Sequence, residues 1–280
     1  MAFQPCVGEL YLDLMKKCLT RSIFPDTHRP LHRPSRNINP LAWAVYPLLA
    51  KTLGKRGVRL YRELQFDPAA RAEGLDWPAQ AETMIGLKRL DNLHACIQRV
   101  IREKVPGDFI ETGVWRGGAC IFMRAALNAY PDGCGRQVWL ADSFEGLPKP
   151  DGRYRQDEGD RHSMFQALSV SLDSVKSNFS RYGLLDDRVR FLKGWFKDTL
   201  PTAPIKSLAI LRLDGDMYSS TMDSLLNLYW RLSVDGYVII DDYGIARCRQ
   251  AVDDFRASNQ IETPLTPIDR SGGVFWRKAN

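Results

Sequence analysis

The sequence predicts an α/β fold in which a mostly parallel sheet carries helices on both faces. Two observations indicate this fold. After about residue 106, short apolar runs alternate regularly with segments of helical periodicity, and before that point the patterns are helical only. Such alternation is typical of parallel strands joined by helices that cover both faces of the sheet. With 280 residues, the chain is long enough to bury a sizeable core.

The N-terminal part shows helical patterns over about 8–20, 41–65 and 80–104. The first two are separated by the proline-rich connector "FPDTHRPLHRPSRNINP", in which proline removes backbone donors and fixes extended or turn geometry. We therefore expect residues 1–105 to form a helical extension or lid and residues 106–280 to form the main domain.

The main domain is expected to contain five apolar runs, most of them joined by helices, and a C-terminal pair of strands. In chain order we expect strand "DFIETGV", helix 117–130, strand "QVWLADS", helix 163–181, strands "VRFLKG" and "SLAILRLDG", helix 219–232, strand "GYVIIDDY", helix 246–258, and strands "LTPID" and "GGVFWRK". In open parallel sheets, ligands bind beyond the carboxyl ends of the strands, near the point where the strand order reverses.

Charge and cysteine usage exclude several classes of protein. The formal charge is +6, but the basic residues are spread out and no nucleic-acid recognition module accompanies them, so we expect no nucleic-acid partner. The six cysteines show no paired or zinc spacing and are expected to be free thiols. No signal peptide pattern is present, and "PLAWAVYPLLA" is too short to span a bilayer. A cytoplasmic protein without a membrane partner is expected, in which this apolar segment covers a cleft or joins the subunits of a homo-oligomer.

A glycine-rich turn follows the first strand of the main domain. In "IETGVWRGGA" it brings a helix N-terminus and its amides close to a ligand, although alone it is a weak signal. The next strand ends in Asp142, about thirty residues after Glu111, at the spacing of an acid that binds ribose hydroxyls. No P-loop lysine is present, so a cationic nucleoside such as S-adenosylmethionine fits better than a pyrophosphate ligand.

Four acids follow two other strands. Asp214 and Asp216 end "LRLDGD", and Asp241 and Asp242 end "VIIDD". Carboxylates that converge from two strand ends form an oxygen site suited to Mg²⁺, and four unpaired carboxylates this close would be costly without a cation. The alternative is that these acids cap the helices that follow them.

These motifs resemble the macrocin O-methyltransferase family, whose members use S-adenosylmethionine and magnesium to methylate sugar hydroxyls of macrolide and aminocoumarin antibiotics. The matching stretches are "TMIGLKRLDNL", "GDFIETGVWRGGA", "ADSFEGLP", "YGLLDDRVRFLKGWFKDTLP", "LRLDGDMYSST" and "VIIDDYG". The match begins near residue 80; residues 30–75 look like an insertion. The resemblance implies a class I methyltransferase (Rossmann-like) fold and a small-molecule hydroxyl acceptor on a glycosylated natural product.

The resemblance also implies roles for individual residues. Asp214, Asp241 and Asp242 occupy the positions of the magnesium ligands, and Asp216 occupies that of the general base. The positions around the methyl donor are Met84, Ile85, Glu111, Thr112, Gly113, Val114, Trp115, Asp142, Ser143, Ser171, Gly194, Trp195 and Phe196.

Several interpretations stay open at this point. His162 touches substrate, acts as an additional base or is a solvent-exposed loop residue, and Trp195 either stacks on adenine or belongs to the core. The acidic segment "RYRQDEGDR" is expected to be a mobile, solvated lid loop. A catechol-like phenol is an alternative acceptor, since two adjacent oxygens suit a metal ion in either case. A nucleotide-sugar oxidoreductase would need a GxGxxG motif that is not found, and a catalytically silent scaffold would not need the intact acids.

Overall fold

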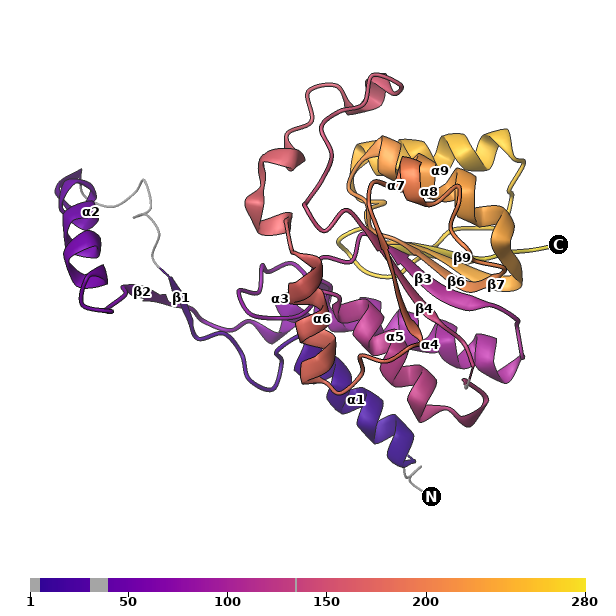
Figure 1. Cartoon of the computed structure of the whole chain (residues 1–280), viewed down its shortest axis with the longest axis horizontal. Helices are drawn as coiled ribbons and strands as arrows, with labels where there is room; N and C mark the ends of the chain where they lie inside the picture. Colours follow the sequence, from indigo (N-terminus) through magenta and orange to yellow (C-terminus); the bar gives the residue numbers. More distant parts are fainter. Residues whose placement is uncertain (1–5, 31–39, 134) are drawn as a thin grey trace.

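The computed structural model describes residues 6–30, 40–133 and 135–280 (Figure 1). Residues 31–39 of the proline-rich connector, and Cys134, lie outside the described residues.

A seven-stranded sheet forms the centre of the molecule. Its strands are β3 (Asp108–Thr112), β4 (Val138–Asp142), β5 (Val189–Lys193), β6 (Leu208–Leu213), β7 (Leu232–Ile240), β8 (Thr266–Pro267) and β9 (Val274–Arg277). They lie in the order β5-β4-β3-β6-β7-β9-β8, and all pairs among the first five are parallel, whereas β9 is antiparallel to β7 and β8. The strand order therefore reverses between β3 and β6, which is where a ligand is expected. The predicted α/β fold is confirmed.

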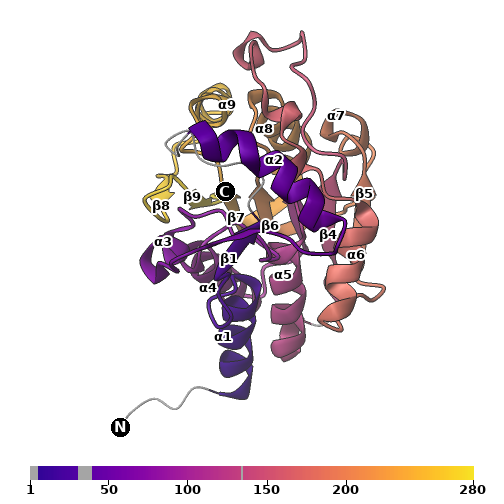
Figure 2. The same cartoon turned by 90° about the vertical axis from the view of Figure 1, so that its left-hand side faces the viewer.

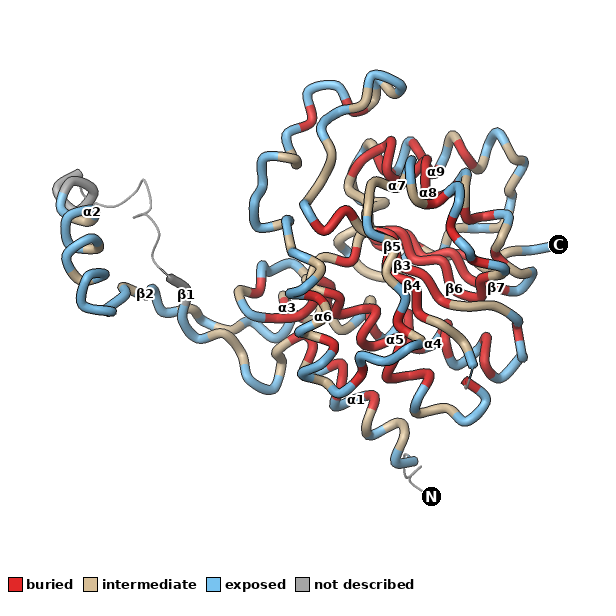
Figure 3. The backbone as a smooth tube through the Cα atoms, in the orientation of Figure 1, coloured by how far each residue is buried: buried red, intermediate tan, exposed pale blue. Residues whose placement is uncertain are grey.

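Helices cover both faces of this sheet (Figure 1). On one face lie α1 (Val7–Leu19), α4 (Leu87–Arg102), α5 (Gly118–Ala129) and α6 (Leu172–Arg181), and on the other lie α7 (Phe196–Thr199), α8 (Tyr218–Leu228) and α9 (Ala246–Ser258). Successive β6 residues point to opposite faces, so Ile210 packs in the first core and Leu211 in the second. Figure 3 shows the buried strands between the two layers.

The N-terminal helices α1 and α4 share a core with the sheet. Apolar residues recur on one face of α4 at Leu90, Leu93 and Ile97, and these pack with Leu12 of α1 and Phe109 of β3. The extension expected over residues 1–105 is therefore attached to the main domain through these two helices.

An arm projects from the body between α1 and α4. It consists of α2 (Pro40–Gly54) and the two-stranded ribbon of β1 (His28–Pro30) and β2 (Tyr61–Glu63). Figure 1 shows it extending outward, and in Figure 2, which faces that side, α2 lies in front of the body. Val45, Leu48 and Leu49 of α2 are exposed. Among the helices that the structure describes, none is both long and apolar enough to cross a membrane. A cover over a cleft and a subunit contact both stay predictions for this arm.

Four predicted helix boundaries were wrong, because tertiary contacts override local periodicity. The helix expected over 41–65 ends at Gly54, since the chain turns at Gly57 (φ +74°) to form β2. The helix expected over 80–104 begins at Leu87, because Arg71 of α3 (Pro68–Glu73) donates hydrogen bonds to the carbonyls of Met84 and Ile85 and holds that segment irregular.

The other two differences concern the start of α6 and the end of α8. The helix expected over 163–181 begins at Leu172, and the preceding chain forms the short 3₁₀ turns η3 (His162–Met164) and η4 (Gln166–Leu168). The helix expected over 219–232 ends at Leu228 and continues only as the 3₁₀ turn η5 (Tyr229–Arg231). Strand β7 starts at Leu232, which pairs with Leu208 before an irregularity in register. Two further 3₁₀ turns are η1 (Pro131–Gly133) and η2 (Arg155–Asp157).

Candidate active site

The glycine turn after β3 holds three strand ends together. Gly113 has φ +87°, and a Cβ at this position would lie 1.7 Å from the carbonyl oxygen of Asp214, so only glycine permits this approach of β3 to β6. The next amide, that of Val114, donates a 2.8 Å hydrogen bond to Asp142 at the end of β4. The turn then enters α5 at Gly117, which also has φ +87°.

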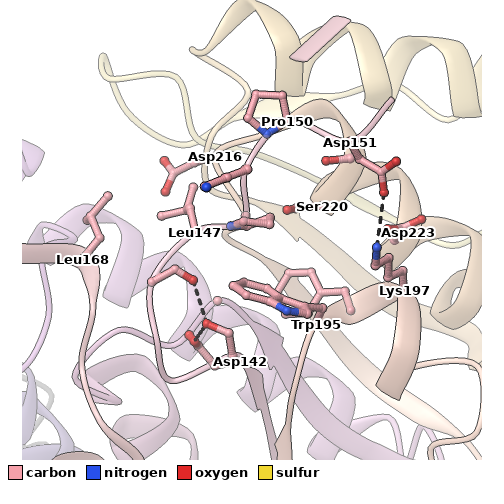
Figure 4. Close-up of a pocket in the computed structure, with 18 of the residues that line it drawn as sticks. Asp142, Leu147, Pro150, Asp151, Leu168, Trp195, Lys197, Asp216, Ser220 and Asp223 are labelled. Atoms are coloured by element: carbon pink, nitrogen blue, oxygen red, sulfur yellow. Dashed lines mark hydrogen bonds and ion pairs between the residues drawn. The ribbon is translucent and has the colours of Figure 1, made fainter. Parts of the chain in front are cut away.

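Asp142 lies beneath Trp195 in a cavity of about 490 Å³ (Figure 4). Its carboxylate accepts hydrogen bonds from the Val114 and Phe144 amides at 2.8 and 2.7 Å. Burial raises the pKa of Asp142, while these backbone hydrogen bonds oppose the rise. A carboxylate has about four lone-pair sites, so two amides leave acceptor capacity for a ligand in the cavity.

Most of the predicted methyl-donor residues line this cavity. They are Met84, Gly113, Trp115, Asp142, Ser143, Gly194, Trp195 and Phe196, and they come from four separate segments of the chain. Trp195 is half-buried and lies at the cavity rather than in the core. Stacking on adenine therefore stays a prediction that the geometry permits.

A second cavity, of about 670 Å³, contains the four acids. One oxygen from each of Asp214, Asp241 and Asp242 lies within 4.8 Å of the others, as the convergence of two parallel strand ends predicts. Asp216 has φ +57°, and its amide donates a 3.0 Å hydrogen bond to Asp242, so the turn brings this side chain back over the cluster. Met84, Trp115, Asp214 and Asp216 line both cavities.

The acids perturb one another electrostatically. Burial raises the pKa of Asp214 and Asp242 well above the usual range, and the neighbouring carboxylates raise it further. Burial also raises the pKa of Asp216 to about 6, although His162 opposes this rise.

The helix-capping alternative for the acids is wrong. The first amides of α8, those of Tyr218 and Ser219, donate 2.9 Å hydrogen bonds to Asp157, and α9 has no side-chain cap. The carboxylates of Asp214 and Asp241 are instead paired with Arg212, an internal cation that was not foreseen. The acids are therefore not all unpaired.

The segment expected to be a mobile, solvated lid loop is largely exposed but anchored to the body by two buried acids, and its mobility stays a prediction. Asp157 is fully buried where it caps α8, and Asp160 is buried in an ion pair with Arg247. Asp160 also accepts a 2.7 Å hydrogen bond from Nδ1 of His162, whose half-buried ring lines the second cavity with Asp216. The DxxD spacing of these acids gave no signal that both would be buried.

Two predicted methyl-donor residues line neither of the two cavities found among the described residues. The hydroxyl of Thr112 accepts a 3.1 Å hydrogen bond from Ser224 of α8, so it points to the other side of the strand. Ser171 accepts a hydrogen bond from the Ser174 amide and is the N-cap of α6. Ile85, Glu111 and Val114 line the second cavity, but the buried Glu111 carboxylate is paired with Arg212.

Fold and site together define the chain as an S-adenosylmethionine-dependent O-methyltransferase of class I fold. The glycine turn, the acid after the second parallel strand and the carboxylates across the switch point all lie at the edge of the sheet where such folds bind ligands. The chain belongs to the macrocin O-methyltransferase family, since the model of the family described as "Macrocin-O-methyltransferase (TylF)" matches residues 8–278.

Curated relatives and a solved structure agree with this assignment. The chain is 50% identical over 271 residues to the 8-demethyl-8-(2,3-dimethoxy-alpha-L-rhamnosyl)-tetracenomycin-C 4'-O-methyltransferase of Streptomyces olivaceus, covering 96% of this chain and 92% of the relative. It is 47% identical to the mycinamicin III 3''-O-methyltransferase of Micromonospora griseorubida, covering 98% and 99% of the two chains. The O-methyltransferase NovP structure matches with a TM-score of 0.81 at 45% identity, covering 98% and 100%.

Proposed function

We propose that the protein is a metal-dependent O-methyltransferase that transfers the methyl group of S-adenosylmethionine to a hydroxyl of a sugar on a natural product. The observation that supports this most directly is the placement of Asp214, Asp241 and Asp242 within 4.8 Å of one another, beside Asp216. This acid cluster shares lining residues with the cavity that suits the methyl donor.

The acid cluster fits a divalent cation chemically. Carboxylate oxygens are the ligands that Mg²⁺ prefers. Burial, and after it the neighbouring carboxylates, raises the pKa of Asp214 and Asp242, so a bound cation would stabilise their ionised form. When bound, the ion would lower the pKa of an acceptor hydroxyl and fix its approach.

The protein's own residues would then position both reactants. Asp142 and Trp195 would hold the ribose and adenine of the donor, and the Gly113 turn would set its depth in the cavity. Asp216 would accept the proton of the acceptor hydroxyl as the oxygen attacks the sulfonium methyl group in line.

The walls of the second cavity support a glycoside as acceptor. Three large apolar side chains at this cavity are well exposed, namely Trp77 (48%), Met164 (72%) and Phe165 (56%). They come from two separate segments and lie in the cavity that also contains the acid cluster. A molecule with a vicinal diol at one end and an apolar body at the other would fit both the acid cluster and the apolar side chains. The names of two relatives, acting on a rhamnosyl tetracenomycin and on mycinamicin III, fit such acceptors.

Replacing Phe165 by alanine should raise KM for a glycoside acceptor by about 5- to 30-fold, since about 1–2 kcal/mol of apolar contact is lost. Turnover at saturation should change little. Initial-rate kinetics would measure this, with Leu226→Ala, an equally exposed residue of α8, as the control. An unchanged KM for the glycoside would contradict the proposal that Phe165 contacts the acceptor.

Replacing Asp142 by alanine should weaken binding of S-adenosylhomocysteine by about 1–3 kcal/mol, because buried ribose hydroxyls lose their acceptor. Titration calorimetry would measure this change. Asp151→Ala is the control, because this half-buried acid lines the same cavity but pairs with Arg153 and Lys197. Binding of S-adenosylhomocysteine with wild-type affinity would show that Asp142 does not hold the donor.

The overall proposal is tested by an acceptor screen with labelled methyl donor, in chelator and in Mg²⁺. Glycosides, their free aglycones and catechols should be compared. Transfer of labelled methyl to glycosides in Mg²⁺ but not in chelator would support the proposal. Preferential label on catechols would favour the phenol alternative.

A further inference from the structure

A buried guanidinium group lies inside the acid cluster. Arg212, on β6, is 1% exposed, and its Nη1 atom donates hydrogen bonds to Glu111 and, at 2.9 Å, to Asp214. Its Nη2 atom donates to Asp241. One side chain therefore contacts two of the three proposed metal ligands and the glutamate at the start of the glycine turn.

A second arginine completes this arrangement from outside the sheet. Arg89 of α4 donates to the other carboxylate oxygen of Asp241, and it also pairs with Asp269 through a 2.5 Å contact. Asp241 thus has both oxygens bound by guanidinium groups. Among the residues that the structure describes, no ion pair reaches Asp216 or Asp242.

We propose that Arg212 is a built-in counter-cation of the metal site, which keeps Asp214 and Asp241 together while no divalent ion is bound. This inference rests on the proposed metal dependence. Buried carboxylates without a cation are strongly destabilising, and a guanidinium fixed to β6 offsets part of their charge permanently. Arg212 is a positioning residue, because it acts through the two carboxylates.

Arg212 and the metal ion are expected to compete for the same carboxylates. Both cations would use Asp214 and Asp241, and they would repel each other across a few ångströms. The contribution of Arg212 to stability is therefore largest when the metal is absent. An arginine that only holds the fold would contribute equally in both states.

The chain offers a matched control for this difference. Arg124 of α5 is 3% exposed and pairs with Asp186 at 3.1 Å. It contacts none of the four acids of the cluster among the described residues. Arg124→Met therefore removes a buried guanidinium from its ion pair with the exposed Asp186 without touching the acid cluster.

The test is thermal unfolding of the whole protein, in chelator and in saturating Mn²⁺, together with direct Mn²⁺ titration. Arg212→Met should lower the midpoint in chelator by roughly 5–15 °C, and saturating Mn²⁺ should restore about 2–5 °C of this loss. By linkage, the variant should bind Mn²⁺ about 5–10-fold more tightly than the wild type. The unfolding midpoint of Arg212→Lys should stay close to that of the wild type. Arg124→Met should lower the midpoint by the same amount in chelator and in Mn²⁺.

Equal losses for Arg212→Met in chelator and in Mn²⁺, or weaker Mn²⁺ binding, would overturn the inference. If Arg212→Met does not fold, Arg89→Met carries the same test, since Arg89 is less enclosed and shares Asp241. A wild-type protein that shows neither Mn²⁺ binding nor a metal-induced shift would overturn both this inference and the proposed metal dependence. If Mn²⁺ raises the unfolding midpoint of the wild type and of Arg212→Met by the same amount, the inference is overturned but the proposed metal dependence is not.

Discussion

Replacing Asp242 by asparagine is expected to lower turnover by at least about 10³-fold, because a lost charged ligand removes several kcal/mol of stabilisation of the reacting oxygen. Asp242 is the most suitable of the three proposed ligands for this test. Asp214 and Asp241 also pair with arginines, so their replacement would disturb the buried network as well. Asparagine keeps an oxygen that can accept the Asp216 amide hydrogen bond.

The measurement is turnover during a Mg²⁺ titration of the chelator-treated protein. The wild type should recover activity, and Asp242→Asn should not recover at any accessible concentration. Asp235→Asn is the matched control, since Asp235 lies at the exposed amino end of the same strand. Wild-type activity that survives exhaustive chelation would refute the metal assignment.

The sheet could be predicted because its strands are short, apolar and locally encoded. All seven lie within, or within a few residues of, the predicted runs. The parallel strands β3, β4, β6 and β7 are largely buried, which gives them the apolar runs typical of such sheets. The errors fell where distant contacts decide the conformation. Residues 80–86 are irregular because Arg71 binds their carbonyls, and nothing in the local pattern announces that contact.

The convergence of the four acids could also be predicted, because parallel strands end at one edge of the sheet. The ion pairs of Arg212 could not be predicted from residue spacing, because no sequence motif marks a charged residue inside a strand. A signal was nevertheless present in "LAILRL": an arginine in an otherwise buried strand requires carboxylate partners. The anchoring of the loop by buried acids was missed for a similar reason, because the burial of Asp157 depends on the amides of α8.

Replacing Asp216 by asparagine is expected to lower turnover by about 10²–10⁴-fold while Mg²⁺ and S-adenosylhomocysteine binding stay nearly unchanged. Asparagine tolerates the left-handed backbone of Asp216 (φ +57°) as well as aspartate does, so the turn and its amide hydrogen bond to Asp242 should persist. The variant therefore removes the proton acceptor with little change in geometry. Single-turnover rates with saturating acceptor would isolate this step from product release.

His162 provides the competing assignment for the proton acceptor. Its Nδ1 is bound to Asp160 and its ring lines the same cavity as Asp216, so its free Nε2 is a possible base. His162→Gln should reduce turnover much less than Asp216→Asn if Asp216 is the base. Full turnover of Asp216→Asn on its true acceptor, with a large loss in His162→Gln, would transfer the role to His162. A large loss in Asp216→Asn accompanied by lost Mg²⁺ binding would instead show that Asp216 serves the metal site rather than the proton.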